Sequence, residues 1–199
     1  IPVEMQDKYL NIILFETERL NKLTKSLLEL NKFGSHGVML DITSFDINHT
    51  IRMTVQTFEG TCMEKHISFN LILSGETLFV SADFSKIQQV LYNLIDNAIK
   101  FSHNDSVIYI QAVGQYEKVF VSVKDTGIGI PKEEQEKIFS RFTKLDREMQ
   151  GTGLGLTLSQ TIVHNLGGRF GVESEVGKGS TFWFILPLVT KKEITNDKI

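Results

Sequence analysis

The stretch from Gln88 to Phe101 constrains the fold of this chain more than any other. Apolar residues recur through it at helical spacing, namely Ile87, Val90, Leu91, Leu94 and Ala98. One stripe of a helix must therefore be buried. At about 100° per residue, Asn93, Asn97 and Lys100 share an arc of roughly 60° beside that stripe. Carboxamide oxygens suit a hard cation such as magnesium and an ammonium suits phosphate, so this edge predicts a metal and phosphate site.

Two glycine-rich runs follow, Asp125 to Ile130 (DTGIGI) and Gly151 to Leu156 (GTGLGL). The second run does not fit a Rossmann fold, because it follows a polar loop and not the first strand of a βαβ unit, and no GxxxxGK[ST] phosphate loop is present. With the asparagine helix, the runs resemble the asparagine box and the two glycine boxes of sensor histidine kinases. These kinases belong to an ATPase family that also includes DNA gyrase and heat-shock chaperones. Ile138 to Phe142 resembles their phenylalanine box, and the resemblance covers roughly Ser44 to Leu188.

The order of the predicted elements favours an α+β fold. We expect a two-layer sandwich, in which helices cover one face of a mixed sheet, preceded by a long N-terminal helix. Asp46 and Asp83 are the expected N-caps of two helices. Helices are predicted at 7–33, 47–64, 84–101, after Pro131 and at 154–165, and strands at 67–73, 78–81, 107–113, 118–124, 169–175 and 180–188.

The chain divides into three predicted parts. Residues 1–37 form one helix, whose apolar residues have the spacing of a coiled-coil seam: Ile13, Leu20, Leu23, Leu27 and Leu30. By resemblance this is the second helix of a dimerisation hairpin; the alternative is an ordinary helix lying on the domain. Residues 38–190 form the catalytic ATP-binding domain, and 191–199 a frayed polar tail.

The composition limits the kinds of partner and the cellular compartment that we expect for this chain. The net charge of −3 gives no electrostatic case for nucleic acid. No run reaches the eighteen or so apolar residues of a membrane helix, and no secretory signal is present, so we expect no direct membrane contact by this chain. The single Cys62 suits a reducing compartment. We expect a cytoplasmic domain. The family resemblance further implies that the parent protein is attached to the membrane.

The resemblance implies roles for the residues of the asparagine helix and the first glycine run. Asn97 would ligate Mg²⁺, while Asn93 and Lys100 would act catalytically at the metal and the phosphates. Asp125 would accept a hydrogen bond from the adenine amine, which guanine lacks at that position. Asn93 stands where hydrolysing relatives have a glutamate, so slow hydrolysis is expected.

The other implied ATP contacts fall on the glycine runs, the lid between them and the last strand. Backbone N–H groups of the second run would meet the phosphates at the start of a helix. Lys144 would supply a lid cation, with Arg141 and Arg147 as further candidates. The implied cofactor-binding residues beyond those above are Phe101, Gly127, Gly129, Ile130, Phe142, Lys144, Gly151, Thr152, Gly153, Leu154, Gly155, Leu156 and Thr181.

None of the five histidines has the sequence context of the family's phosphate acceptor. We therefore expect a fragment that cannot phosphorylate itself and that transfers phosphate to a histidine on another helix. The implied partners are a second copy of the parent kinase, through the first helix, and the receiver domain of a response regulator. Two alternatives stay open: a regulatory ATP-binding module without kinase activity, and a serine kinase of the anti-sigma type.

Overall fold

The computed structural model describes residues 3–35, 39–75, 77–143 and 151–188. Lys144, Arg147, Gln150, Gly37 and the predicted tail at 191–199 lie outside these ranges. The elements, in chain order, are α1 (Val3–Ser35), β1 (Ile42–Asp46), α2 (Ile47–Gln56), α3 (Glu59–Lys65), β2 (Ser68–Leu73), β3 (Phe79–Asp83), α4 (Phe84–Phe101), β4 (Val107–Gln115), β5 (Lys118–Lys124), the 3₁₀ helix η1 (Lys137–Phe139), α5 (Gly155–Asn165), β6 (Arg169–Glu175) and β7 (Gly179–Pro187).

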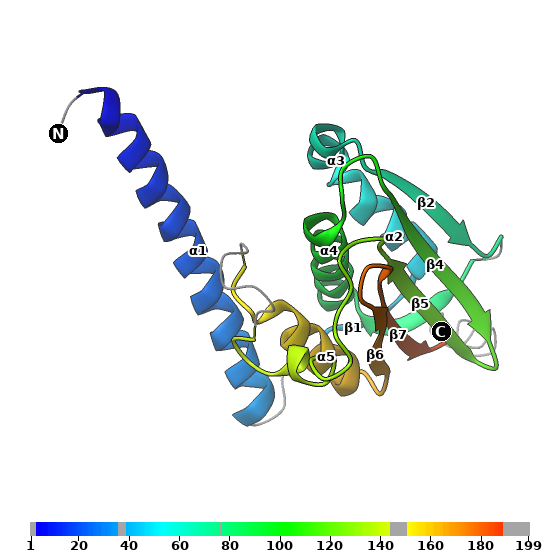
Figure 1. Cartoon of the computed structure of the whole chain (residues 1–199). Coiled ribbons are helices and arrows are strands. Elements are labelled where there is room, and N and C mark those ends of the chain that lie inside the picture. Colours follow the sequence, from blue (N-terminus) through cyan, green and yellow to red (C-terminus); the bar gives the residue numbers. More distant parts are fainter. Residues whose placement is uncertain (1–2, 36–38, 76, 144–150, 189–199) are drawn as a thin grey trace.

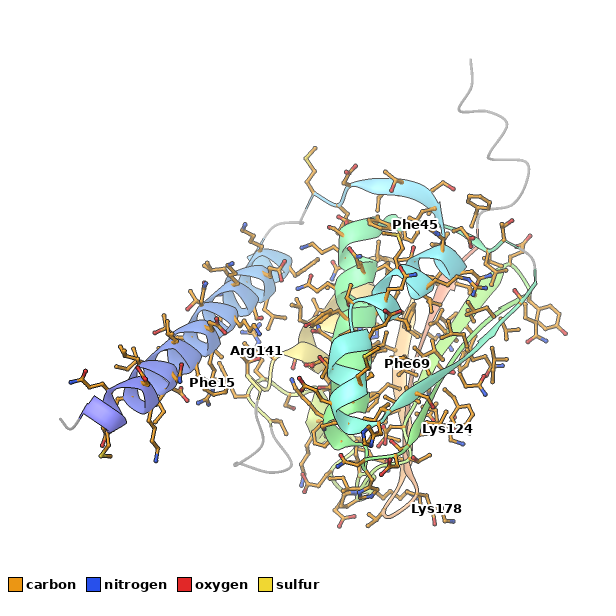
Figure 2. All side chains as sticks on the ribbon, turned by 90° about the horizontal axis from the view of Figure 1, so that it is seen from above. Phe15, Phe45, Phe69, Lys124, Arg141 and Lys178 are labelled. Carbon is orange, nitrogen blue, oxygen red and sulfur yellow. The ribbon has the colours of Figure 1, made fainter. Side chains whose placement is uncertain are left out.

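Five strands form the main sheet, in the order β2-β4-β5-β7-β6. β2 and β4 run parallel and the other neighbouring pairs antiparallel, so the sheet is mixed. β1 and β3 form a separate antiparallel pair. Helices α2, α4 and α5 lie on one face of the main sheet, with α1 beyond them (Figures 1 and 2). The predicted α+β sandwich with a leading helix is confirmed.

Helix α4 lies at the centre of the helical layer. Its apolar stripe is completely buried, as the sequence predicted; Ile87, Val90, Leu91, Leu94 and Ile95 are each 0% exposed. At its N-terminus the Asp83 side chain accepts a hydrogen bond from the backbone N–H of Lys86. This cap and the buried stripe fix the rotation of α4, and with it the direction of the asparagine edge.

Two predicted helices differ from the observed structure. The helix expected at 47–64 begins at Ile47 with Asp46 as its N-cap, but it breaks into α2 and α3. Thr57 turns back at the break, where its hydroxyl donates to the carbonyl of Thr54 (2.7 Å), an alternative to helical pairing that threonine readily takes. After Pro131 there are only turns and η1, because the Gln135 amide donates to the carbonyls of Ile130 and Ser174 and ties the segment to β6.

Within the described residues, helix α1 packs on the rest of the chain mainly through its C-terminal half. Leu30 is buried, whereas Ile13 and Leu20 are about 60% exposed (60% and 59%). Figure 1 shows the N-terminal end of α1 standing away from the other elements. The helix therefore lies on the domain and also presents an uncovered apolar seam. Within the ranges that the structure describes, no helix is both long and apolar enough to cross a bilayer.

Candidate functional site

A cavity of about 980 Å³ opens beside the asparagine edge of α4. This volume is at the upper end of the range for small-molecule sites. Three groups of residues make up most of its lining: the edge of α4, both glycine runs, and one face of α1. The sequence predicted that the first two would meet, and the fold brings them together. The predicted lining residues are Asn93, Asn97, Lys100, Phe101, Asp125, Gly129, Ile130, Gly151, Thr152, Gly153, Gly155 and Leu156.

The polar edge of α4 is partly engaged before any ligand arrives. The Asn93 amide donates to the carbonyl of Gly155 and to the hydroxyl of Ser159, both at 3.2 Å, which ties α4 to α5. The Lys100 ammonium forms an ion pair with Asp96 one turn earlier on the same helix. Both groups of this pair are about one-third exposed, so the interaction is screened and readily exchanged.

Asp125 is almost completely enclosed, with 3% of its surface exposed. Its Oδ1 accepts hydrogen bonds from the backbone N–H groups of Gly127 (2.9 Å) and Ser180 (3.2 Å). Burial raises the pKa of this carboxyl above its usual value, although both hydrogen bonds oppose the shift. Among the described residues no donor reaches Oδ2, so this second oxygen remains for a ligand in the cavity.

The first glycine run is pressed between two other backbone segments. A Cβ on Gly127 would lie 2.0 Å from the carbonyl oxygen of Phe101, at the end of α4. A Cβ on Gly129, whose φ is +70°, would lie 2.0 Å from the carbonyl oxygen of Glu175, at the end of β6. Both positions therefore require glycine, because the backbone of another segment occupies the space that a side chain would need.

The second glycine run leads into α5, which begins at Gly155. Gly153 has a φ of +71°, and Gly155 faces the Asn93 side chain, whose amide carbon would lie 3.6 Å from an added Cβ. The N-terminus of α5 therefore lies beside the asparagine edge. The free N–H groups and partial positive charge of a helix start favour an anion there.

Five predicted binding residues are not placed in the lining. Gly127 packs against the end of α4, Leu154 is 0% exposed in the core, and Phe142 is 56% exposed with a φ of +63°. Thr181 alternates with Ser180 and Phe182 along β7; these two line the cavity, and Thr181 points to the opposite face of the sheet. Lys144 lies outside the described residues.

The sequence did not predict several residues in or beside the cavity. Asp96 precedes Lys100 by one helical turn, and that i, i+4 spacing was a usable signal for the ion pair. Ser159 and Ser180 meet Asn93 and Asp125 only through the tertiary fold, and no local pattern marks them. The face of α1 that lines the cavity was likewise not foreseen. Arg141, a candidate lid cation, lies on the side of the domain nearer α1 and does not line the cavity (Figure 2).

The donor set fits magnesium delivered with a nucleotide better than a metal held by protein alone. Within the described ranges, no three His, Cys, Asp or Glu side chains gather as a metal site. The cavity edge instead offers the carboxamide of Asn97 and the carboxylate of Asp96. Mg²⁺ commonly takes one or two protein oxygens and completes its shell with phosphates and water.

Comparison with known proteins identifies relatives across the chain. Residues 82–190 match the family model of the histidine kinase-, DNA gyrase B-, and HSP90-like ATPase. The sensor histidine kinase WalK of Bacillus subtilis (strain 168) is 36% identical over 196 residues, which are 96% of this chain and 32% of that protein. The chain thus spans about a third of the length of this relative.

Two solved structures extend the likeness to the arrangement in space. Full-length ShkA in complex with AMPPNP matches with a TM-score of 0.83 and 28% identity, covering 93% of this chain and 39% of that one. The histidine kinase ThkA in complex with the response regulator protein TrrA matches with a TM-score of 0.78 and 35% identity. That match covers 95% of this chain and 53% of the ThkA structure's chain.

Proposed function

The chain belongs to the histidine kinase-, DNA gyrase B-, and HSP90-like ATPase family, and on that premise we propose that it is the ATP-binding catalytic part of a sensor histidine kinase. One observation carries the proposal: the asparagine edge of α4, the buried Asp125 and the second glycine run line a single cavity. In this proposal ATP is the phosphoryl donor, and a histidine on a dimerisation helix outside this chain is the acceptor.

The base of ATP is selected at the buried end of the cavity. Oδ2 of Asp125 accepts a hydrogen bond from the adenine amine, while Oδ1 keeps its bonds to Gly127 and Ser180. Guanine carries an oxo group at the corresponding position and would leave a buried carboxylate oxygen unpaired, which is costly. Phe101, Gly129 and Ile130, which line the cavity, enclose the base.

The polyphosphate lies along the asparagine edge and the start of α5. Asn97 gives its carboxamide oxygen to Mg²⁺, which neutralises charge on the β- and γ-phosphates when it is bound with ATP. Lys100 exchanges Asp96 for phosphate oxygens. Asn93, held by Gly155 and Ser159, orients the phosphate end. A carboxamide cannot accept a proton from water as a general base, which supports transfer to a histidine over hydrolysis.

Helix α1 connects this site to the partners of the parent protein. The exposed apolar residues of its N-terminal half include Leu10, Ile13, Leu14 and Leu20, each at least 56% exposed. A helix cannot bury such a seam alone, so we assign it to the hairpin of a kinase dimer. The receiver domain of a response regulator is the further partner, and the parent kinase is attached to the membrane with this part in the cytoplasm.

The test is phosphoryl transfer from γ-labelled ATP with Mg²⁺. The chain is extended at its N-terminus by a hairpin helix that carries a histidine, as in the full parent kinase. Acid-labile phosphohistidine, lost in Asn97→Ala and Asp125→Asn, supports the proposal. Phosphoserine on an added protein would favour the serine kinase, and ATP binding without any transfer would favour a regulatory module.

A further inference from the structure

One face of α1 forms a wall of the nucleotide cavity. Its side chains in the cavity lining are mostly three or four residues apart: Phe15, Glu18, Arg19, Lys22, Lys25, Ser26, Leu28, Glu29 and Lys32. Four of them are cationic, and Arg19, Lys22 and Lys25 follow one another at a spacing of three residues. This face is distinct from the exposed apolar seam, and the dimerisation proposal does not account for it.

The orientation of α1 is fixed by contacts near its C-terminal end. Leu30 is 3% exposed within the core. Glu29 accepts hydrogen bonds from the Lys86 ammonium (2.6 Å) and the Gln89 amide (2.8 Å), both on α4. Although burial opposes ionisation of Glu29, these bonds hold its pKa below the usual value. We call this group, Glu29 with Lys86 and Gln89, the α1 clamp.

From the clamp, the two helices carry their polar groups along the same cavity. At a rise of about 1.5 Å per residue, Lys25 and Lys22 lie roughly 6 and 10 Å along α1 from Glu29. Asn93 and Asn97 lie roughly 6 and 12 Å along α4 from Gln89. α1 also lies beside α5, whose start carries the second glycine run (Figure 1). Lys22 and Lys25 therefore belong to the wall of a cavity whose lining also includes Asn97, Lys100 and the start of α5.

Lys22 and Lys25 form no ion pair within the described ranges. Arg19 pairs with Glu16 and Lys86 with Glu29, and no carboxylate of these ranges comes within ion-pair distance of Lys22 or Lys25. Glu18 and Glu29 line the same wall one helical turn away, but neither pairs with these lysines, so both ammonium groups remain available for an anionic ligand in the cavity.

We propose that Lys22 and Lys25 of α1 bind the polyphosphate of ATP across the cavity from Asn97 and Lys100. The inference rests on the proposed function, since it takes ATP as the ligand. It makes α1 part of the nucleotide site, and it makes the α1 clamp the contact that sets the distance between the lysines of α1 and the asparagine edge of α4. ATP binding would then stabilise the clamped arrangement of α1, because only that arrangement offers both groups.

The test is calorimetric titration of the whole chain and of the double variant Lys22→Gln/Lys25→Gln with Mg²⁺–ATP, ADP and adenosine. We expect ATP affinity to fall about tenfold, as the loss of two screened charge-assisted contacts implies, with a smaller loss for ADP and none for adenosine. Lys8→Gln is the matched control, because Lys8 is an exposed lysine of the same helix that does not line the cavity. Lys22→Arg/Lys25→Arg should restore ATP affinity, since the charge is kept.

Equal ATP affinity in the double variant and the unaltered chain would overturn the inference. An equal loss for ATP and adenosine would also overturn it, because the effect would then come from a changed cavity and not from phosphate contacts. If the unaltered chain itself ignored ATP, the proposed function would fail. Titration of the unaltered chain with ATP therefore distinguishes failure of the proposed function from failure of this inference.

Discussion

The two ends of the cavity reach their shape by different means. At the inner end, Asp125 is buried. Gly127 and Gly129 lie so close to the backbone of other segments that an added Cβ would overlap a carbonyl oxygen. At the outer end, Asn97 and Lys100 are half-buried side chains on a helix edge, faced by the exposed lysines of α1. The inner end is preformed, whereas the outer end has side chains that must change partners to bind phosphate.

This contrast assigns different tasks to the two ends. A preformed site with a buried carboxylate discriminates between bases, because a wrong base leaves that carboxylate without its partner. An outer end made of exposed and half-buried cations contributes affinity that depends on charge and is screened by salt. Substitutions at the inner end should therefore act on folding or on specificity, and those at the outer end should produce graded changes in phosphate affinity.

The largest expected effect is that of Gly129→Ala. The new Cβ would overlap the Glu175 carbonyl oxygen, and a φ of +70° is strained for alanine, so either the run or the β6–β7 turn must move. We expect a loss of about 3 kcal/mol in unfolding free energy, measured by urea denaturation, together with loss of ATP binding. Gly75→Ala is the control, since nothing lies within 4 Å of its Cβ. Equal stability of the two variants would show that the inner end is not rigid.

Asp125→Asn should separate binding from folding. The asparagine Oδ1 can keep the hydrogen bonds from Gly127 and Ser180, so the fold survives. The new amide would face the adenine amine, donor against donor, and we expect about a hundredfold loss of ATP affinity by calorimetry. A variant that bound ATP as well as the unaltered chain would remove Asp125 from base recognition.

Asp125→Asn should also change how the free energy of unfolding depends on pH. Because the pKa of Asp125 is raised in the folded protein, its ionised form destabilises the fold. That contribution is absent below the unfolded pKa of about 3.9, grows as pH rises through the folded pKa, and is then constant. Asp125→Asn should therefore gain stability relative to the unaltered chain as pH rises above about 4, until Asp125 is fully ionised in the folded protein, measured by denaturation. Glu29 and Asp83, whose pKa values are lowered, act equally in both proteins and cancel in the difference.

The same contrast explains what the sequence could and could not predict. The outer end lies on one helix, so the spacing of Asn93, Asn97 and Lys100 was enough to group them. The inner end depends on contacts between segments distant in sequence, such as Gly129 with Glu175 and Asp125 with Ser180. The glycine pattern located these residues through family resemblance, but it did not reveal the backbone segments that pack against Gly127 and Gly129.

The prediction errors have similar causes. Thr181 was expected at the base, but β7 directs Ser180 and Phe182 into the cavity, and one residue of strand register decides between them. The break between α2 and α3 depends on a threonine hydroxyl competing for a backbone carbonyl, which an apolar periodicity does not reveal. The wall formed by α1 depends on the α1 clamp, a pairing of side chains nearly sixty residues apart in the chain.

At the outer end, Lys100 and Asp96 should have opposite effects. Lys100→Gln removes a cation from the phosphates, and we expect ATP affinity to fall roughly five- to tenfold. Asp96→Asn frees Lys100 from its ion pair and removes a negative charge from the cavity, so affinity should rise about twofold. Titrations at low and high salt should show both effects shrinking as salt increases. A loss in Asp96→Asn would instead mark Asp96 as a metal ligand.

Gly155→Ala should have the smallest effect, and it tests whether every glycine of a glycine run needs to be glycine. The added Cβ would meet the Asn93 side chain at 3.6 Å, an ordinary contact, and no backbone obstructs it. Alanine favours a helix by about 0.5–1 kcal/mol over glycine, so thermal unfolding should show unchanged or slightly higher stability. We expect ATP affinity to stay within about threefold, since Gly155 begins α5 and its own N–H is unaltered. Abolished binding would place the phosphates directly against Gly155, and close backbone approach would then be required at both ends of the cavity.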